Sequence, residues 1–285
     1  MDGNRDIHAP QSELRLRLER CDNARLAGII GDMTDAITDI VNKHQISIEE
    51  FRAAVAFARD IGLATDDRRN EWVLLFDTMG ISGAVEAANL IRPTGATPQT
   101  MLGPFHRSKA PAKANGDTIS IDNVGTPLAF LTKVVDLDGQ PIPDATVDVW
   151  QANSDGVYEN QDPDSQPEFN LRGRFQTDAR GQASFQTVRP AGYTLPEDGP
   201  VGHLMRLLGQ SMTRPAHIHF RVEAKGFQTL VTQVLDRSDP HIETDPLFCA
   251  SSELRADFGD TSSPDSHNVR FTFKLARSRP GASQN

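Results

Sequence analysis

The hydrophobic pattern of the chain changes its period near residue 96, and this change constrains the fold more than any other feature. Up to that point apolar residues recur every three or four positions, as in a helix with one apolar face. Within residues 23–43 they are Leu26, Ile30, Met33, Ile37 and Ile40. From Thr97 onward the apolar residues form short alternating runs, which is the pattern of β-strands. The chain is therefore predicted to be an α+β protein.

The first part, residues 1–96, is predicted to hold four helices. One covers residues 23–43, and the next begins at a capping box, Ser47 with Glu50, and ends near Gly62. The other two are expected over residues 67–79 and from Ser82 to just before Pro93. Their apolar faces must pack on the rest of the chain or on a second copy of it.

The second part, residues 97–276, is predicted to be a mainly antiparallel β-sandwich. Turn sequences such as Asp138-Gly139 separate its apolar runs. Many short strands with such turns are typical of a sandwich. The expected strands are 129–135, 146–151, 183–188, 218–222, 229–235 and 269–274. Residues 277–285 are polar, contain Pro and Gly, and are expected to be a flexible tail.

Composition excludes several classes of protein. The net charge is −10 and there is no run of Arg or Lys, which argues against nucleic acid and against an anionic membrane surface as partners. No apolar run approaches the ~18–20 residues that cross a bilayer, so no membrane insertion is expected. Cys21 and Cys249 form no CxxC pair, and Met1–Gln11 lacks the apolar stretch of a secretory signal. A cytoplasmic protein is expected.

The strongest local indication of chemistry is a His-x-His pair after a proline. Because side chains alternate along a strand, His217 and His219 share the face opposite to Ile218 and Phe220. Two histidines on one strand face are close enough to bind one metal ion. Zinc with a third His or a carboxylate, and iron(II) with a carboxylate, are both compatible with this pair.

The two tyrosines of the chain offer another set of ligands. Fourteen phenylalanines accompany only Tyr158 and Tyr193, and both tyrosines follow glycine-containing loops at the ends of expected strands. A trivalent cation favours the phenolate over the phenol, whose pKa is ordinarily about 10. Two phenolates and two neutral imidazoles would suit iron(III). Taken singly, each tyrosine also fits an ordinary sandwich position with its hydroxyl on a backbone group.

Several ordered segments resemble the intradiol ring-cleaving dioxygenases, which open catechols between their two hydroxyl groups. The resemblance covers about residues 74–258 well and the helical part more loosely. The segments are Leu102-Gly103-Pro104-Phe105, Asp148-Val149-Trp150-Gln151-Ala152-Asn153, Gly156-Val157-Tyr158, Phe169-Asn170-Leu171-Arg172-Gly173, Pro190-Ala191-Gly192-Tyr193, Asp198-Gly199-Pro200, Arg214-Pro215-Ala216-His217-Ile218-His219-Phe220 and Thr232-Gln233.

The resemblance implies a role for each matching residue. Fe(III) would be the cofactor, with Tyr158 and His217 as equatorial ligands and Tyr193 and His219 as axial ligands. Tyr193 would also take a proton from the substrate. Arg214 and Gln233 would act beside the aromatic ring. Further residues that match substrate-pocket positions are Leu74, Asp77, Gly103, Pro104, Phe105, Phe248 and Cys249.

Within this family the chain is most similar to the hydroxyquinol 1,2-dioxygenases, which convert benzene-1,2,4-triol and O2 to maleylacetate. Leu74-Leu75-Phe76-Asp77, Gln166-Pro167-Glu168-Phe169 and Asp198-Gly199-Pro200-Val201-Gly202 carry this likeness. In that subgroup an acidic residue at the position of Asp77 lies near the ring, where a third hydroxyl needs an acceptor. Asp239-Pro240-His241 and His106 depart from the family pattern.

Two further readings of the chain follow from these residues. One is a catechol 1,2-dioxygenase giving cis,cis-muconate, and the other is a non-catalytic transthyretin-like binding module, suggested by the stretch 136–150. The resemblance also implies a homodimer formed through the N-terminal helices, with a phospholipid held between the subunits.

Overall fold

The computed structural model describes residues 10–66, 69–89, 92–259 and 268–278. The chain forms two compact units, Met1–Leu63 and Ala64–Asn285. The expected lack of a secretory segment at Met1–Gln11 concerns mostly residues outside this description, and so does most of the expected tail at 277–285. Within the described ranges, none of the helices combines the length and the apolar character needed to cross a membrane.

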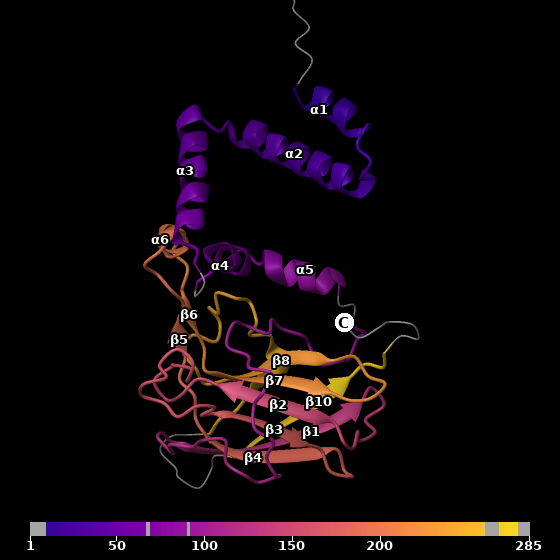
Figure 1. Cartoon of the computed structure of the whole chain (residues 1–285), viewed down its shortest axis with the longest axis vertical. Coiled ribbons are helices and arrows are strands. Elements are labelled where there is room, and N and C mark those ends of the chain that lie inside the picture. Colours follow the sequence, from indigo (N-terminus) through magenta and orange to yellow (C-terminus); the bar gives the residue numbers. More distant parts are fainter. Residues whose placement is uncertain (1–9, 67–68, 90–91, 260–267, 279–285) are drawn as a thin grey trace, which may run out of the picture. The chain divides into compact units, whose positions relative to one another are not determined.

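The first unit is helical (Figure 1), with α1 (Pro10–Leu18), α2 (Ala24–His44) and α3 (Ile48–Ala64). Helix α2 begins where expected because the Asn23 side chain accepts a hydrogen bond from the Leu26 amide at 3.0 Å. The capping box before α3 is present, since Ser47 N donates to Glu50 Oε2 at 2.8 Å and Glu50 N to Ser47 Oγ at 3.2 Å. Helix α1 was not predicted, because its sequence has no apolar stripe.

The described part of the second unit holds three α-helices, α4 (Glu71–Thr78), α5 (Ile81–Asn89) and α6 (Pro200–Leu207), and the short 3-10 helix η1 (Ser252–Leu254). Helix α4 starts later than the predicted residue 67, because Asn70 Oδ1 caps it by accepting from Val73 N at 3.1 Å. The buried Glu71 carboxylate accepts from the Val201 amide at 3.0 Å and from Arg69 Nε at 2.6 Å. These bonds tie the start of α4 to the start of α6, which the sequence did not predict.

The remainder of the second unit consists of β-sheets, as predicted. A three-stranded sheet has the order β10-β1-β4 and a five-stranded sheet the order β3-β2-β7-β8-β9. Neighbouring strands are antiparallel except for β1–β10 and β8–β9. Strands β5 and β6 form a separate small sheet. The bounds are β1 (Pro127–Asp136), β2 (Thr146–Gln151), β3 (Arg172–Gln176), β4 (Gln182–Val188), β5 (Tyr193–Thr194), β6 (Thr213–Arg214), β7 (His217–Glu223), β8 (Leu230–Asp236), β9 (Arg255–Ala256) and β10 (Asn268–Leu275).

All six predicted strands are present, each within two residues of the expected ends. The four strands that were not predicted are β3, β5, β6 and β9. Three of these have only two residues, too few for an alternating pattern to appear. An α+β chain with its helices largely first and a mainly antiparallel sandwich after them is therefore confirmed.

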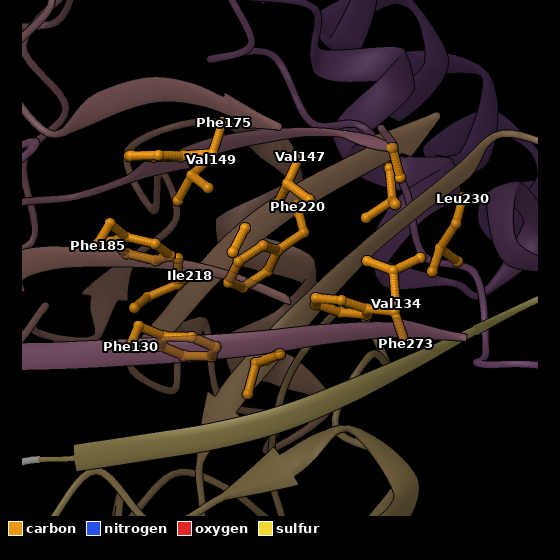
Figure 2. Packing of buried hydrophobic residues seen from close by; sticks show 14 of the residues in the cluster. Phe130, Val134, Val147, Val149, Phe175, Phe185, Ile218, Phe220, Leu230 and Phe273 are labelled. Carbon is orange, nitrogen blue, oxygen red and sulfur yellow. The ribbon is translucent and has the colours of Figure 1, made fainter. Parts of the chain in front are cut away.

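Aromatic and branched side chains fill the space between the two large sheets (Figure 2). Phe130 stacks on Phe185 with ring centroids 5.3 Å apart, and Phe220 packs 5.1 Å from Phe130. Burying each such ring contributes roughly 1.5–3 kcal/mol. Ile218 and Phe220 of β7 lie in this core, so the alternating residues His217 and His219 face the other side of the sheet, as predicted.

Candidate metal centre and active site

A tight turn after β2 carries Tyr158 into the interior. The Asn153 side chain accepts hydrogen bonds from the amides of Asp155 and Val157, both at 2.9 Å. Gly156 adopts a φ of +81°, and a Cβ there would lie 2.7 Å from the Gly192 carbonyl oxygen. Only glycine fits this close approach, and the result is that the Tyr158 side chain is completely buried.

The other three candidate ligands lie on strands β5 and β7. Tyr193 opens β5 and pairs with Arg214 of β6. His217 and His219 lie on β7, where each is only 2% exposed. The expectation that the two histidines share one face is confirmed, and that face is buried rather than solvated.

The four aromatic side chains converge on one place. Ring centroids are 4.9 Å apart for His217 and His219, 5.5 Å for Tyr193 and His217, and 5.8 Å for Tyr158 and Tyr193. The Tyr158 Oη lies 3.5 Å from His217 Nε2. Residues that are up to 61 positions apart in the sequence thus present two phenol oxygens and two imidazoles to a common centre.

Burial keeps both histidines in the form that binds a metal. The pKa of His217 is lowered to about 3, first by burial and then by the charge of Arg214. The pKa of His219 is lowered well below its usual value by burial and by the charge of His217. His217 Nδ1 lies 2.7 Å from the Pro215 carbonyl oxygen, so it carries the proton and leaves Nε2 free as an acceptor.

Tyr158 needs a cation in order to ionise. Burial, and next the neighbouring Tyr193, raise the pKa of Tyr158 well above its usual value, while the charge of Arg214 opposes them. A nearby trivalent ion would reverse this shift. The buried His219 Nδ1 also lacks a hydrogen-bond partner among the described residues. Two phenols and two neutral imidazoles form a hard donor set that fits iron(III).

A ligand set built from carboxylates has less support. In the described part of the chain, no group of three or more His, Cys, Asp or Glu side chains is placed to hold a metal ion. The zinc and iron(II) alternatives both need such a group around the His pair. The tyrosines are the oxygen donors that lie beside the two histidines.

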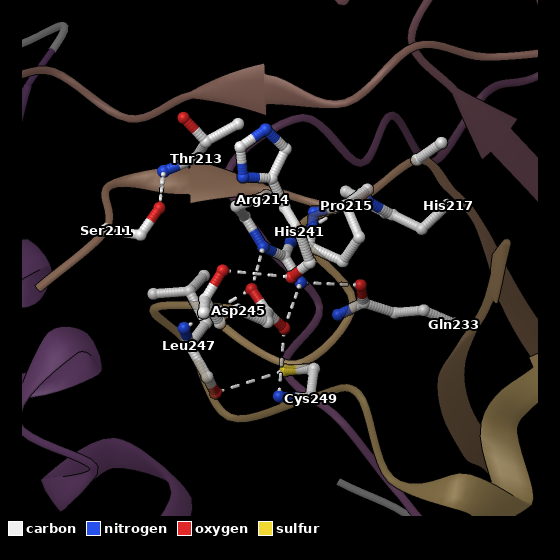
Figure 3. Close-up of polar contacts among 12 residues, drawn as sticks. Ser211, Thr213, Arg214, Pro215, His217, Gln233, His241, Asp245, Leu247 and Cys249 are labelled. Atoms are coloured by element: carbon white, nitrogen blue, oxygen red, sulfur yellow. Dashed lines mark hydrogen bonds and ion pairs between the residues drawn. The ribbon is translucent and has the colours of Figure 1, made fainter. Parts of the chain in front are cut away.

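Arg214 lies beside the cluster and is held from several directions (Figure 3). Its Nη1 is 3.3 Å from His217 Nε2, its Nη2 donates to Gln233 Oε1 at 2.8 Å, and its Nε donates to Asp245 Oδ1 at 3.1 Å. Gln233 is paired with His219 across β7 and β8. Burial would lower the pKa of Arg214, but the charges of Tyr193 and Asp245 raise it, so the guanidinium is always charged.

Asp245 was not predicted, although it holds Arg214 in place. Its carboxylate accepts from the Cys249 amide at 3.0 Å as well as from the arginine (Figure 3). Burial alone would raise the pKa of Asp245, but Arg214 lowers it below the usual value. A buried arginine requires a carboxylate partner, yet spacing alone does not identify which of the 39 acidic residues supplies it.

The segment Gly103–Phe105 packs directly on the cluster. The Phe105 ring stacks on Tyr158 at 4.3 Å, and a Cβ added at Gly103, whose φ is +72°, would lie 3.6 Å from the His219 ring. The buried Arg172 fixes this segment by donating to the Phe105 carbonyl oxygen at 2.5 Å. Gly103, Pro104 and Phe105 are therefore brought to the site, as expected.

His106 packs on Trp150, which in turn packs on a candidate ligand. Its Nε2 lies 3.0 Å from Asp148 Oδ2, and its ring meets the edge of Trp150 at 4.7 Å. Trp150 in turn stacks on the His219 ring at 4.8 Å with an interplanar angle of 6°. His106, which departs from the family pattern, thus packs against the ring that supports the candidate ligand His219. The sequence did not indicate this supporting role.

The remaining predicted pocket residues lie on α4 and in the loop that follows Asp245. Leu74 and Asp77 are half-buried on α4, and the charge of Arg214 acts on the Asp77 carboxylate. The pKa of Asp77 is raised, first by burial, with Ser82 and Arg214 opposing. Cys249 is buried beside Asp245, whereas Phe248 is 69% exposed and its ring lies next to Gly80.

Known proteins match both parts of the chain. The family model described as "Dioxygenase" matches residues 101–277, and that described as "Catechol dioxygenase N terminus" matches residues 23–97. A hydroxyquinol 1,2-dioxygenase of Rhizobium sp. is 40% identical over 85% of this chain and 82% of that protein. A catechol 1,2-dioxygenase of Candida albicans is 34% identical over 88% of this chain and 84% of that protein.

A solved structure gives the same picture at the level of the fold. The crystal structure of a hydroxyquinol 1,2-dioxygenase from Pseudomonas putida DLL-E4 superposes with a TM-score of 0.88 at 30% identity. The match covers 94% of this chain and 98% of that one. The chain therefore belongs to the family of intradiol ring-cleavage dioxygenases.

Proposed function

We propose that the protein is an iron(III) hydroxyquinol 1,2-dioxygenase that cleaves benzene-1,2,4-triol with O2 to maleylacetate. The observation that carries the metal assignment is the convergence of Tyr158, Tyr193, His217 and His219 on one buried place. These four side chains would hold the ion. When bound, iron(III) would withdraw charge from a coordinated diol and make the aromatic ring reactive towards dioxygen.

The side chains of the protein supply the rest of the reaction. Tyr193, which is less buried than Tyr158, would accept a proton of the incoming diol on its Oη as a phenolate and become a neutral phenol. Arg214 stays cationic and can stabilise negative charge as it develops on the ring oxygens. Gln233 and Asp245 fix the direction of the guanidinium, so no reorientation is needed during the reaction.

Asp77 supports hydroxyquinol rather than catechol as the substrate. Its carboxylate is half-buried and within electrostatic range of Arg214, and a third ring hydroxyl would give it a second donor beside Ser82. The 40% identity to a protein named as a hydroxyquinol 1,2-dioxygenase points in the same direction. Catechol 1,2-dioxygenase activity giving cis,cis-muconate is the second candidate, favoured by the catechol relative at 34% identity.

Oxygen uptake by the iron-loaded protein tests both candidates. We expect a higher kcat/KM with hydroxyquinol than with catechol, and maleylacetate as the product. A preference for catechol would replace the first candidate by the second. A colourless protein that binds no iron and consumes no oxygen would support the non-catalytic binding module instead.

We also infer a homodimer formed through the first unit. On α2 a row of large apolar side chains is about half exposed: Leu26, Ile29, Met33, Ile37 and Ile40. Soluble monomers rarely expose a continuous apolar patch of this kind. Sedimentation would give the mass of a dimer, and Met33→Asp would shift it towards the monomer. Mass spectrometry of an organic extract would test for the phospholipid that the family resemblance implies.

A cytoplasmic location is part of the same proposal. Cys21 and Cys249 are both free thiols, and Cys21 is exposed. Exposed free thiols persist in a reducing compartment. Fractionation of the cells that make the protein would test this assignment.

A further inference from the structure

A row of three rings leads up to the candidate metal centre, on the face of the sheet that points away from the aromatic core. His106, Trp150 and His219 follow one another in this row, with ring centroids 4.7 and 4.8 Å apart. Trp150 of β2 lies opposite His219 of β7 in the antiparallel register, so the two side chains share one face. Their rings are nearly parallel, with an interplanar angle of 6°. The indole therefore covers one face of the candidate ligand.

The two candidate histidine ligands are held in different ways. His217 is fixed by a hydrogen bond, because its Nδ1 lies 2.7 Å from the Pro215 carbonyl oxygen. The buried Nδ1 of His219 has no protein partner among the described residues, and neither has the buried Nε1 of Trp150. A metal-binding histidine usually gains its orientation from a hydrogen bond at its second nitrogen. The direction of the His219 ring thus depends on ring packing, to which Trp150 contributes a whole face.

His106 ties this row of rings to a buried carboxylate. Its Nε2 lies 3.0 Å from Asp148 Oδ2, and both side chains are largely buried. Asp148 and Trp150 alternate with the core residue Val149, so they project to the same face of β2. A buried carboxylate needs a hydrogen-bond donor, and His106 provides one. The imidazole is thereby held against the indole, at an interplanar angle of 65°.

We propose that Asp148 and His106 are positioning residues for the candidate ligand His219, on which they act through Trp150. The carboxylate fixes the imidazole of His106, this imidazole limits the movement of the indole, and the indole sets the plane of the ligand ring. Asp148 thus influences the bound ion without supplying a ligand atom. The inference rests on the proposed iron(III) site and extends it to residues outside the four candidate ligands.

The matched pair Asp148→Leu and Asp148→Asn tests this proposal in the iron-loaded enzyme. Both side chains are close to aspartate in size and neither leaves a buried charge unpaired, but only asparagine keeps an acceptor for His106. Outer-sphere partners of a metal site change metal affinity by roughly 10–100-fold. Because the effect passes through two rings, iron release to an excess of chelator should be about tenfold faster in Asp148→Leu. In Asp148→Asn it should stay close to the wild-type rate.

The EPR spectrum of the ferric enzyme is a readout that a merely structural role would not change. If His219 is less firmly oriented, the geometry at the ion varies from molecule to molecule, so the signal should broaden in Asp148→Leu. It should stay sharp in Asp148→Asn. Val149→Ala controls for general destabilisation, since Val149 belongs to the same strand but faces the core. This control should melt at a lower temperature without a change in the release rate or in the EPR signal.

His106→Gln is the second variant, to be used if Asp148→Leu folds poorly. Glutamine can still donate to Asp148 but presents no ring to Trp150, so faster iron release and a broader EPR signal are expected here too. Trp150→Leu removes the ring that contacts His219 directly. It should show the largest change of the series, up to roughly 100-fold in release rate.

Two results would overturn the proposal. One is that Asp148→Leu, Asp148→Asn and the wild type release iron equally fast and give the same EPR signal. The other is an equal change in Val149→Ala, which would reduce the effect to a loss of stability. If the wild type binds iron and cleaves diols while Asp148→Leu matches it, only the positioning role is wrong. If the wild type binds no iron, the proposed function fails as well.

Discussion

The two sides of the candidate active site are built in different ways. The side with the four aromatic ligands stands on β5, β7 and a turn whose glycine cannot be replaced, and His217 and His219 are almost fully buried. The opposite side consists of α4 and the 245–251 loop, where Asp77 is half-buried and Phe248 is exposed. Rigid strands suit a metal that needs fixed geometry, whereas helices and loops can vary with the substrate. We infer that the strand side determines the chemistry and the helix side the choice of ring.

The largest effect is expected from removing one phenol oxygen on the strand side. Tyr158→Phe keeps the buried ring and its stacking on Phe105 but deletes a ligand atom. Loss of iron or of the visible phenolate-to-iron charge-transfer band should follow. Activity should fall by more than the roughly 10–100-fold that outer-sphere partners of a metal site contribute. Iron content, absorption spectrum and oxygen uptake measure the change.

The control for this variant is Phe105→Leu, which changes the ring stacked on Tyr158 but removes no candidate ligand atom. It should keep the band. If Tyr158→Phe also retains both its iron and its band, then Tyr158 is not a ligand and the proposed division of the site is wrong.

The two sides also differ in how far the sequence predicted them. The alternation around Ile218 and Phe220 placed both histidines on one face, because a strand allows no other arrangement. The tyrosines needed the family resemblance, since their turns bring them together only in three dimensions. The position of Asp245 could not be predicted, because loop conformation depends on contacts such as the bond from the Cys249 amide.

The shortest strands and the exact helix ends were likewise not predicted from the sequence. Long periodic segments such as α2 and β2 were predicted nearly to the residue. Strands of two residues, such as β5, carry no periodicity at all. Helix α4 began later than expected because a single side chain, Asn70, determines its first turn.

The next largest effect is expected at the contact between the two sides. Asp245→Asn leaves Arg214, which is 3% exposed, without its buried counter-charge. Breaking a buried ion pair in this way costs about 3–5 kcal/mol of stability. The variant should melt at a lower temperature and lose roughly 10–100-fold in kcat, while the iron band persists. If Asp245→Asn loses as much iron as Tyr158→Phe, then the strand side and the helix side do not have separate functions.

A change on the helix side alone should alter substrate choice and little else. Asp77→Asn removes the charge that we expect to meet the third hydroxyl, at nearly constant size. A hydrogen bond to a charged group is worth about 1.5–3 kcal/mol. The kcat/KM for hydroxyquinol should therefore fall about tenfold or more, with catechol as the internal control. An equal fall in kcat/KM with both substrates would show that Asp77 acts in the reaction itself and does not select between the two rings.

The smallest effect concerns pH and the same carboxylate. Burial raises the folded-state pKa of Asp77 above its usual 3.8, and the ionised carboxylate accepts a stronger hydrogen bond from the substrate than the protonated carboxyl group does. The ratio of kcat/KM for hydroxyquinol to that for catechol should thus be highest above this pKa. It should decline as the pH falls through it, at a higher pH than for an ordinary aspartate. Taking the ratio cancels protonation steps that both substrates share, including those of the metal ligands. Asp77→Asn should make the ratio independent of pH, and a variant that keeps the wild-type decline would assign the titration to another group.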